Sequence, residues 1–102
     1  MIKKLKLMPD YECFALWDID SVGNIDAASL PISADLKERI ARWEDVYDCT
    51  LNKDDPTASG FQDSDEEKNF DNEGRLIWKK LKHELGESYD VRYFSVMENI
   101  LI

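Results

Sequence analysis

Polar and apolar residues alternate strictly near the start of the chain. The segment Lys4-Leu5-Lys6-Leu7 has the period of a half-buried strand, and Pro9-Asp10 then supplies a turn. Residues 12–17 form a short apolar run rich in aromatics, which is typical of a central strand covered on both faces. The two runs are close enough to form a hairpin. We expect the acidic segment 18–29, with its Gly23-Asn24 turn signal, to be a loop.

The apolar period then changes to that of a helix. We expect a first helix over about residues 34–50, because Ser33 is a suitable N-cap and Asp35 complements the helix dipole. Its apolar positions are spaced by four, three and four residues, and we interpret them as core: Leu36, Ile40, Trp43 and Tyr47.

Turn-forming residues fill the next segment, in Asp54-Asp55-Pro56 and Ser59-Gly60. Phe61 is a large apolar side chain in this otherwise polar stretch. It either packs the loop against the core or is available to a partner, and we favour the first interpretation.

A second helix is expected from the capping box formed by Ser64 and Glu67 to the stop signal at Gly86. Glycine is unfavourable inside a helix, so Gly74 indicates a close approach to a neighbouring element. The apolar stripe of this helix comprises Phe70, Gly74, Ile77, Trp78, Leu81 and Leu85.

The end of the chain returns to a strand pattern over residues 89–97, and the short apolar tail 99–102 either extends this strand or covers an edge. We therefore expect one α+β domain over residues 1–102, with a small antiparallel sheet of about three strands packed against two helices in the order β-β-α-α-β. No apolar run is long enough for a membrane helix and no secretory leader is recognisable, so we expect a cytoplasmic protein.

The chain is acidic, with 22 acidic and 13 basic side chains and a formal net charge of −9. Residues 43–73 contain eleven acids and two bases, so the net charge of this segment, −9, equals that of the whole chain. This balance disfavours nucleic acid and anionic membranes as partners and favours a basic protein. The acidic stretch is either a solvated loop with charged helix starts or a docking surface for a cationic partner.

Motifs for catalysis and for cofactor binding are not found. The single histidine, His83, lies on the second helix away from its apolar stripe, and the two distant cysteines form no zinc pattern. Residues 18–26 resemble the start of a calcium-binding EF-hand loop, but Val22 has no ligand oxygen at the fifth position and Ser29 replaces the bidentate glutamate of the twelfth. We therefore expect no enzymatic activity, no metal and no cofactor, and we expect the cysteines to be reduced.

Several segments together resemble a known family. The pattern covers about residues 30–93 and resembles the immunity proteins of contact-dependent growth inhibition, which are small acidic proteins encoded beside bacterial polymorphic toxins. The resemblance implies an intracellular inhibitor that binds one cognate toxin domain, often a nuclease, and covers its active site or substrate groove. The segments that carry it are Leu30-Pro31-Ile32-Ser33, Tyr47-Asp48-Cys49-Thr50-Leu51-Asn52, Asp54-Asp55-Pro56, Ser59-Gly60-Phe61, Glu73-Gly74 and Glu84-Leu85.

Our leading hypothesis is an immunity protein, or antitoxin, that captures a cationic toxin, because an acidic surface can occupy the basic groove in which a nuclease holds phosphates. Phe61 is the expected apolar anchor. The expected electrostatic contacts are Asp54, Asp55, Asp63, Asp65, Glu66, Glu67 and Asp71. Two alternatives stay open: a small acidic scaffold or regulatory domain without a toxin partner, and a metal-dependent enzyme that uses Asp18, Asp20 and Asp26 or acids of the 54–73 stretch.

Overall fold

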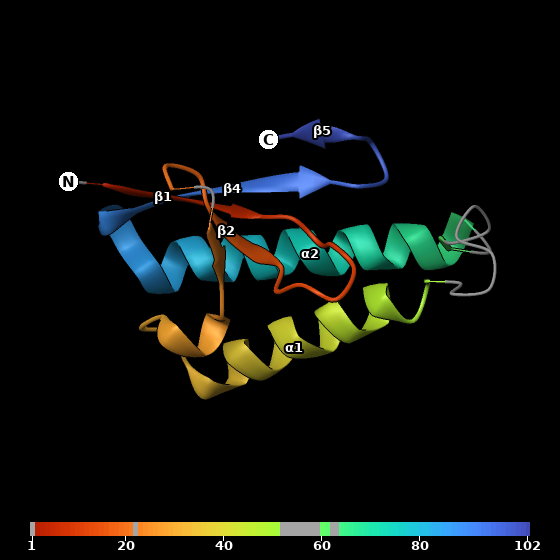
Figure 1. The fold of residues 1–102 in the computed structure, drawn as a ribbon, viewed down its shortest axis with the longest axis horizontal. Helices are drawn as coiled ribbons and strands as arrows, with labels where there is room; N and C mark the ends of the chain where they lie inside the picture. The colour runs from red at the N-terminus through yellow and green to blue at the C-terminus, as the bar shows by residue number, and fades with distance from the viewer. Residues whose placement is uncertain (1, 22, 52–59, 62–63) are drawn as a thin grey trace.

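The computed structural model describes residues 2–21, 23–51, 60–61 and 64–102. Two α-helices and five strands, with two short 3-10 turns, make up most of this part of the chain (Figure 1). In chain order the elements are β1 (Lys3–Leu7), β2 (Leu16–Asp18), β3 (Gly23–Ile25), η1 (Ala27–Ser29), α1 (Ala34–Asp48), α2 (Ser64–Leu85), η3 (Gly86–Ser88), β4 (Tyr89–Ser95) and β5 (Ile100–Leu101).

The strands form one mixed sheet in the order β3-β2-β1-β4-β5. β1 lies at the centre, antiparallel to β2 and parallel to β4, so that Leu5 is opposite Asp18 on one side and Val91 on the other. The expected α+β class is confirmed, but the expectation of about three antiparallel strands is wrong in number and in direction. The expected order β-β-α-α-β is also corrected, since β3 precedes α1 and β5 follows β4. β3 and β5 have only three and two residues, too few for an alternating pattern to show. β1 and β4 are parallel, and the segment between them, which includes both helices, supplies the long crossover that a parallel pair requires.

Side chains of α1 hold the segment between β1 and β2. The expected strand over residues 12–17 is confirmed only at its last two residues, where β2 begins. Before that point the N–H of Ala15 donates to Glu44 Oε2 at 2.6 Å, and the N–H of Glu12 donates to Asp48 Oδ1 at 3.0 Å. Glu12 has a φ of 58°, in the left-handed region that a strand does not use. Burial raises the pKa of Glu44, and the Ala15 N–H offsets this only in part.

The expected loop over residues 18–29 contains β3 and η1, so this part of the expectation is wrong. The Asp18 carboxylate accepts hydrogen bonds from the N–H groups of Asp20 at 3.0 Å and Ser21 at 3.2 Å, closing a turn after β2. Asn24 Nδ2 donates to the carbonyl of Phe14 at 2.7 Å and so ties β3 to the preceding segment. In its described residues, the stretch that resembles the start of a calcium loop thus contains the end of β2, a turn and β3.

Both helices lie on the same side of the sheet, with α2 against β4 and α1 beside α2 (Figure 1). The first helix begins as expected, because Ser33 Oγ accepts a hydrogen bond from the N–H of Leu36 at 3.2 Å. The Glu84 carboxylate of α2 in turn accepts the N–H of Ser33 at 2.6 Å and its hydroxyl at 3.0 Å. The expected end of the second helix is also confirmed, since Gly86 has a φ of 70°.

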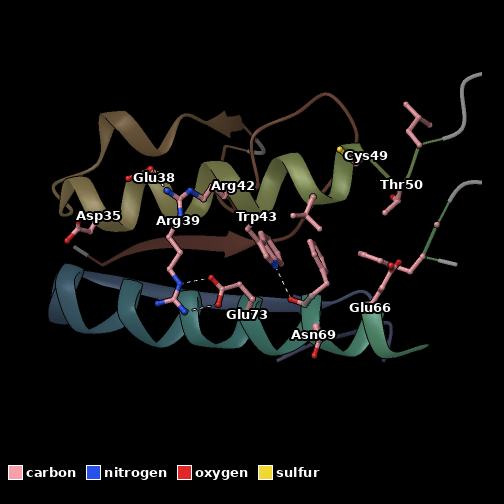
Figure 2. Close-up of a pocket in the computed structure, with 15 residues that line it drawn as sticks. Asp35, Glu38, Arg39, Arg42, Trp43, Cys49, Thr50, Glu66, Asn69 and Glu73 are labelled. Atoms are coloured by element: carbon pink, nitrogen blue, oxygen red, sulfur yellow. Dashed lines mark hydrogen bonds and ion pairs between the residues drawn. The ribbon is translucent and has the colours of Figure 1, made fainter. Parts of the chain in front are cut away.

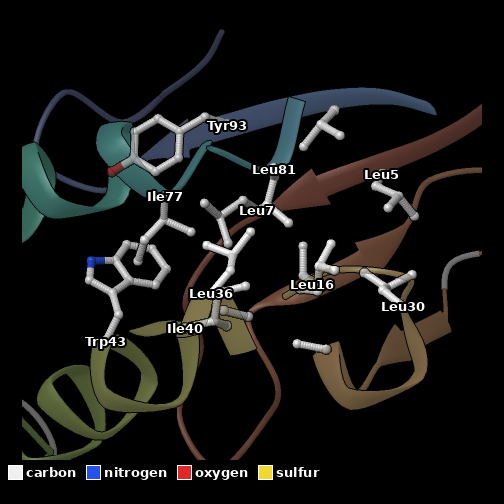
Figure 3. Close-up of a cluster of buried hydrophobic side chains, with 14 of the residues drawn as sticks. Leu5, Leu7, Leu16, Leu30, Leu36, Ile40, Trp43, Ile77, Leu81 and Tyr93 are labelled. Carbon is white, nitrogen blue, oxygen red and sulfur yellow. The ribbon is translucent and has the colours of Figure 1, made fainter. Parts of the chain in front are cut away.

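One cluster of buried apolar side chains joins the sheet to both helices (Figure 3). Each fully buried aliphatic side chain of this kind contributes roughly 1.5–3 kcal/mol. Gly74 lies where the layers meet, because a Cβ atom there would be 2.5 Å from Tyr93 Oη and 2.6 Å from the Trp43 ring. The close approach expected at this glycine is therefore confirmed. The cluster includes Leu5, Leu7, Leu16, Leu36, Ile40, Trp43, Ile77, Leu81 and Tyr93.

Candidate functional site

A groove of about 1360 Å³ runs between the outer surfaces of α1 and α2 (Figure 2). It continues past the end of α1 to the short segment before α2. The two helices supply most of its walls because they lie side by side on the sheet. Its described lining residues are Asp35, Glu38, Arg39, Arg42, Trp43, Val46, Cys49, Thr50, Leu51, Gly60, Phe61, Glu66, Asn69, Phe70 and Glu73.

The floor of the groove is aromatic and fixed in place. The Trp43 and Phe70 rings stack with their centroids 4.4 Å apart, and Trp43 Nε1 donates to the Phe70 carbonyl at 2.9 Å. The half-buried ring of Phe61 lies 5.0 Å from Phe70 at a tilted angle. Tyr47 does not line the groove, but its ring lies 5.6 Å from Phe70, and burial raises its pKa to about 12. These contacts leave the floor rings little freedom to rearrange.

Ion pairs cross the groove and line its wall. Arg39 binds Glu73 through two hydrogen bonds, from Nε at 2.5 Å and from Nη2 at 2.7 Å, and so links α1 to α2. Arg42 Nη2 donates to Glu38 at 2.5 Å along α1. Each of the two lining arginines is therefore matched by a glutamate, and the additional acids Asp35 and Glu66 leave the described lining with a negative balance.

The acids expected to contact a partner fall into separate places. Asp65 and Glu66 are exposed and Glu67 is half-buried, all in the first turn of α2 beside the groove. Phe61, the expected apolar anchor, packs against the core and also lines the groove. Asp54, Asp55 and Asp63 lie outside the described residues.

Asp71, another of the expected electrostatic contacts, is buried with 3% of its area exposed. Its Oδ1 atom accepts hydrogen bonds from Tyr93 Oη at 2.9 Å and Ser95 Oγ at 2.8 Å. Its Oδ2 atom accepts one from Arg75 Nε at 2.8 Å. Burial alone would raise the pKa of Asp71, but the bonds from Arg75, Ser95 and Tyr93 outweigh burial and lower it. This carboxylate therefore joins α2 to β4 inside the protein.

Sequence reasoning missed both the internal role of Asp71 and the groove. A signal for the first exists, because Asp71 is three residues before Gly74 on the apolar stripe and four before Arg75. No comparable signal exists for the Arg39–Glu73 pair, whose members are 34 residues apart in the chain.

The other candidate residues show no assembled site. Within the described ranges, no group of three or more His, Cys, Asp and Glu side chains has a geometry that could hold a metal ion. His83 is exposed on α2, and Cys13 and Cys49 are both free thiols. Neither described helix has a stretch both long and apolar enough to cross a membrane.

The mixed sheet with two helices on one side, and the groove between those helices, define a small α+β domain with a groove lined by acidic and aromatic residues. A protein-family model, described as Serratia CdiI immunity protein-like, matches residues 3–96. The chain therefore belongs to the Serratia CdiI immunity protein-like family, the immunity proteins of contact-dependent growth inhibition. A search of curated proteins finds no significant match.

Proposed function

We propose that this chain binds one cognate toxin domain and neutralises it by covering its active site or substrate groove. The toxin surface that it covers is cationic, and the toxin is a nuclease that acts on an anionic nucleic-acid backbone. The family supports the general role, since CdiI-type immunity proteins are defined by protection from a toxin. The charge on the partner follows from the acids beside the groove.

The proposal rests on one observation: acidic side chains and an aromatic side chain lie close together at one end of the molecule. Asp65, Glu66 and Glu67 follow one another in the first turn of α2, and Phe61 lies just before them on the groove. Clustered carboxylates raise the rate of encounter with a basic surface, and a central aromatic side chain supplies much of the affinity after contact. Asp71 is left out of this surface because its carboxylate is bonded internally.

The direct experiment uses the toxin domain encoded beside this chain. The purified chain is titrated into that domain in a calorimeter, and the nuclease activity of the mixture is measured at each ratio. We expect binding with one chain per toxin domain and loss of nuclease activity at the same ratio. In cells, production of the chain is expected to restore growth when the toxin domain is also produced.

The result that contradicts the proposal is the absence of binding together with unchanged toxin activity and no rescue of growth. That outcome favours the alternative of an acidic scaffold or regulatory domain. Binding to a toxin with a different reaction contradicts the nuclease assignment alone.

A further inference from the structure

We infer that the groove between α1 and α2 receives an apolar side chain of the toxin that is flanked by lysine or arginine residues. This inference rests on the proposed function and names the chemistry of the toxin segment that enters the groove. Its supports are the accessible apolar side chains of the groove, Val46 and Phe61, and the charge of the lining.

The accessible apolar surface of the groove favours an apolar occupant. Trp43 and Phe70 are stacked but only 2% and 5% exposed, so this surface comes from the half-buried Phe61 and from Val46. The indole N–H of Trp43 is already bonded to the Phe70 carbonyl, so the floor offers no free donor from that ring. An aliphatic or aromatic side chain gains by leaving water on such a surface, whereas a polar one loses its hydration without replacement.

The wall beside this floor is also apolar and open. Val46 on α1 has 50% of its area exposed while lining the groove. A half-exposed valine next to buried aromatic rings enlarges the apolar surface available to a partner. Single exposed apolar residues are common, but Val46 and the half-buried Phe61 line the same groove.

The charges of the lining require that the occupant be flanked by cations. Arg39 and Arg42 are each held by a lining glutamate, so the positive charge of the groove is already matched. Asp35 is exposed on the lining and Asp65 is exposed in the first turn of α2, and both add negative charge. A toxin segment with lysine or arginine beside its apolar residue complements this arrangement, whereas an acidic segment is repelled.

Cys49 provides a native probe of this groove. It is an exposed free thiol on the groove lining, whereas the other free thiol, Cys13, lies on the β1–β2 side of α1, outside the groove lining. Each thiol is labelled with a maleimide reagent in a variant in which the other is replaced by serine, with and without saturating toxin domain. We expect toxin to slow labelling of Cys49 by about tenfold, because access then requires dissociation, and to leave Cys13 nearly unchanged.

Substitutions at Val46 test the chemistry of the occupant. Val46→Arg places a cation in the groove, and Val46→Glu places an anion of similar reach. We expect Val46→Arg to weaken toxin binding by about 30-fold, the size of a hot-spot loss, and Val46→Glu to weaken it less. The matched control is Ile100→Arg on β5, where the side chain is 49% exposed and is not part of the groove lining. This control is expected to change the Kd by less than about twofold.

The outcomes separate this inference from the proposed function. If toxin binds but Cys49 labelling is unchanged and both Val46 variants bind normally, the groove inference is wrong and the proposed function stands. If Val46→Glu weakens binding as much as Val46→Arg, the cationic flank is wrong. If Cys49 is already unreactive in the free chain, the groove is filled by this chain itself. If Cys49 becomes unreactive only as the concentration of the chain rises, the groove is filled by a second copy. Either result overturns the inference.

Discussion

Asp65 and Asp71 lie six residues apart on α2, and the structure uses them in opposite ways. Asp65 is exposed in the first turn of the helix. Asp71 has 3% of its area exposed and accepts hydrogen bonds from Tyr93, Ser95 and Arg75. Both belong to the same acidic stretch, so a count of charges along the chain overstates the surface that a partner meets.

Other acids of this stretch divide in the same way. Glu44 is half-buried and holds the β1–β2 segment through the Ala15 N–H. Inward carboxylates such as Asp71 and Glu44 stabilise the fold, whereas we propose that those at the start of α2 attract a partner. Removing an inward acid is therefore expected to lower stability, and removing an outward one is expected to change binding.

Asp71→Ala is expected to lower the free energy of unfolding by about 3 kcal/mol, because it leaves Tyr93 Oη, Ser95 Oγ and the Arg75 guanidinium without their shared acceptor. Urea unfolding followed by circular dichroism measures this loss. Asp65→Ala on the same helix is the matched control and is expected to cost at most about 1 kcal/mol through the helix dipole. Equal losses in the two variants would remove the distinction between inward and outward acids.

Gly74→Ala tests the layer contact beside Asp71. The added Cβ would lie 2.5 Å from Tyr93 Oη and 2.6 Å from the Trp43 ring, so the layers must separate or the rings must move. We expect a loss of about 2 kcal/mol, in the range for overpacked cores. Gly23→Ala, whose Cβ would have its nearest neighbour at 3.6 Å, is expected to change stability by about 0.5 kcal/mol or less. A stable Gly74→Ala variant would contradict the close contact.

The pH dependence of stability gives a further comparison. The pKa of Asp71 is lowered in the folded protein, so the unfolded state binds its proton more readily. The stabilisation by this carboxylate is therefore fully present above the unfolded pKa of about 3.9 and is lost as the pH falls through the folded value. Urea unfolding of the native chain and of Asp71→Asn is expected to show a difference at pH 7 that narrows below about pH 4. A difference that stays constant with pH would contradict an ionised Asp71.

Arg39→Met removes the ion pair across the groove. The Arg39 and Glu73 side chains are 33% and 36% exposed, so water screens their attraction. We expect a loss of no more than about 1 kcal/mol, measured by urea unfolding. A loss as large as that of Asp71→Ala would contradict this, because the ion pair would then stabilise the fold as much as the Asp71 hydrogen bonds do.

Much of the fold was predictable because its signals are local. The N-cap at Ser33 and the stop at Gly86 depend on neighbouring residues. Gly74 is recognisable as a glycine inside a helical pattern, and the structure places its Cα against Trp43 and Tyr93. β3 and β5 escaped prediction because their few residues form strands only by pairing with longer neighbours. The groove escaped it because its floor and its ion pair join two helices that are distant in the chain.

The most direct test of the central claim is the association rate of the cognate toxin domain, measured by stopped flow at low and high salt. The variant Asp65→Lys/Glu66→Lys is compared with Asp20→Lys/Glu87→Lys, which makes the same charge change at exposed positions outside the groove lining. We predict that the first variant associates about tenfold more slowly than the second at low salt, and that high salt removes most of this difference. Equal rates for the two variants at low salt would contradict the claim that the acids at the start of α2 guide a cationic toxin to this surface.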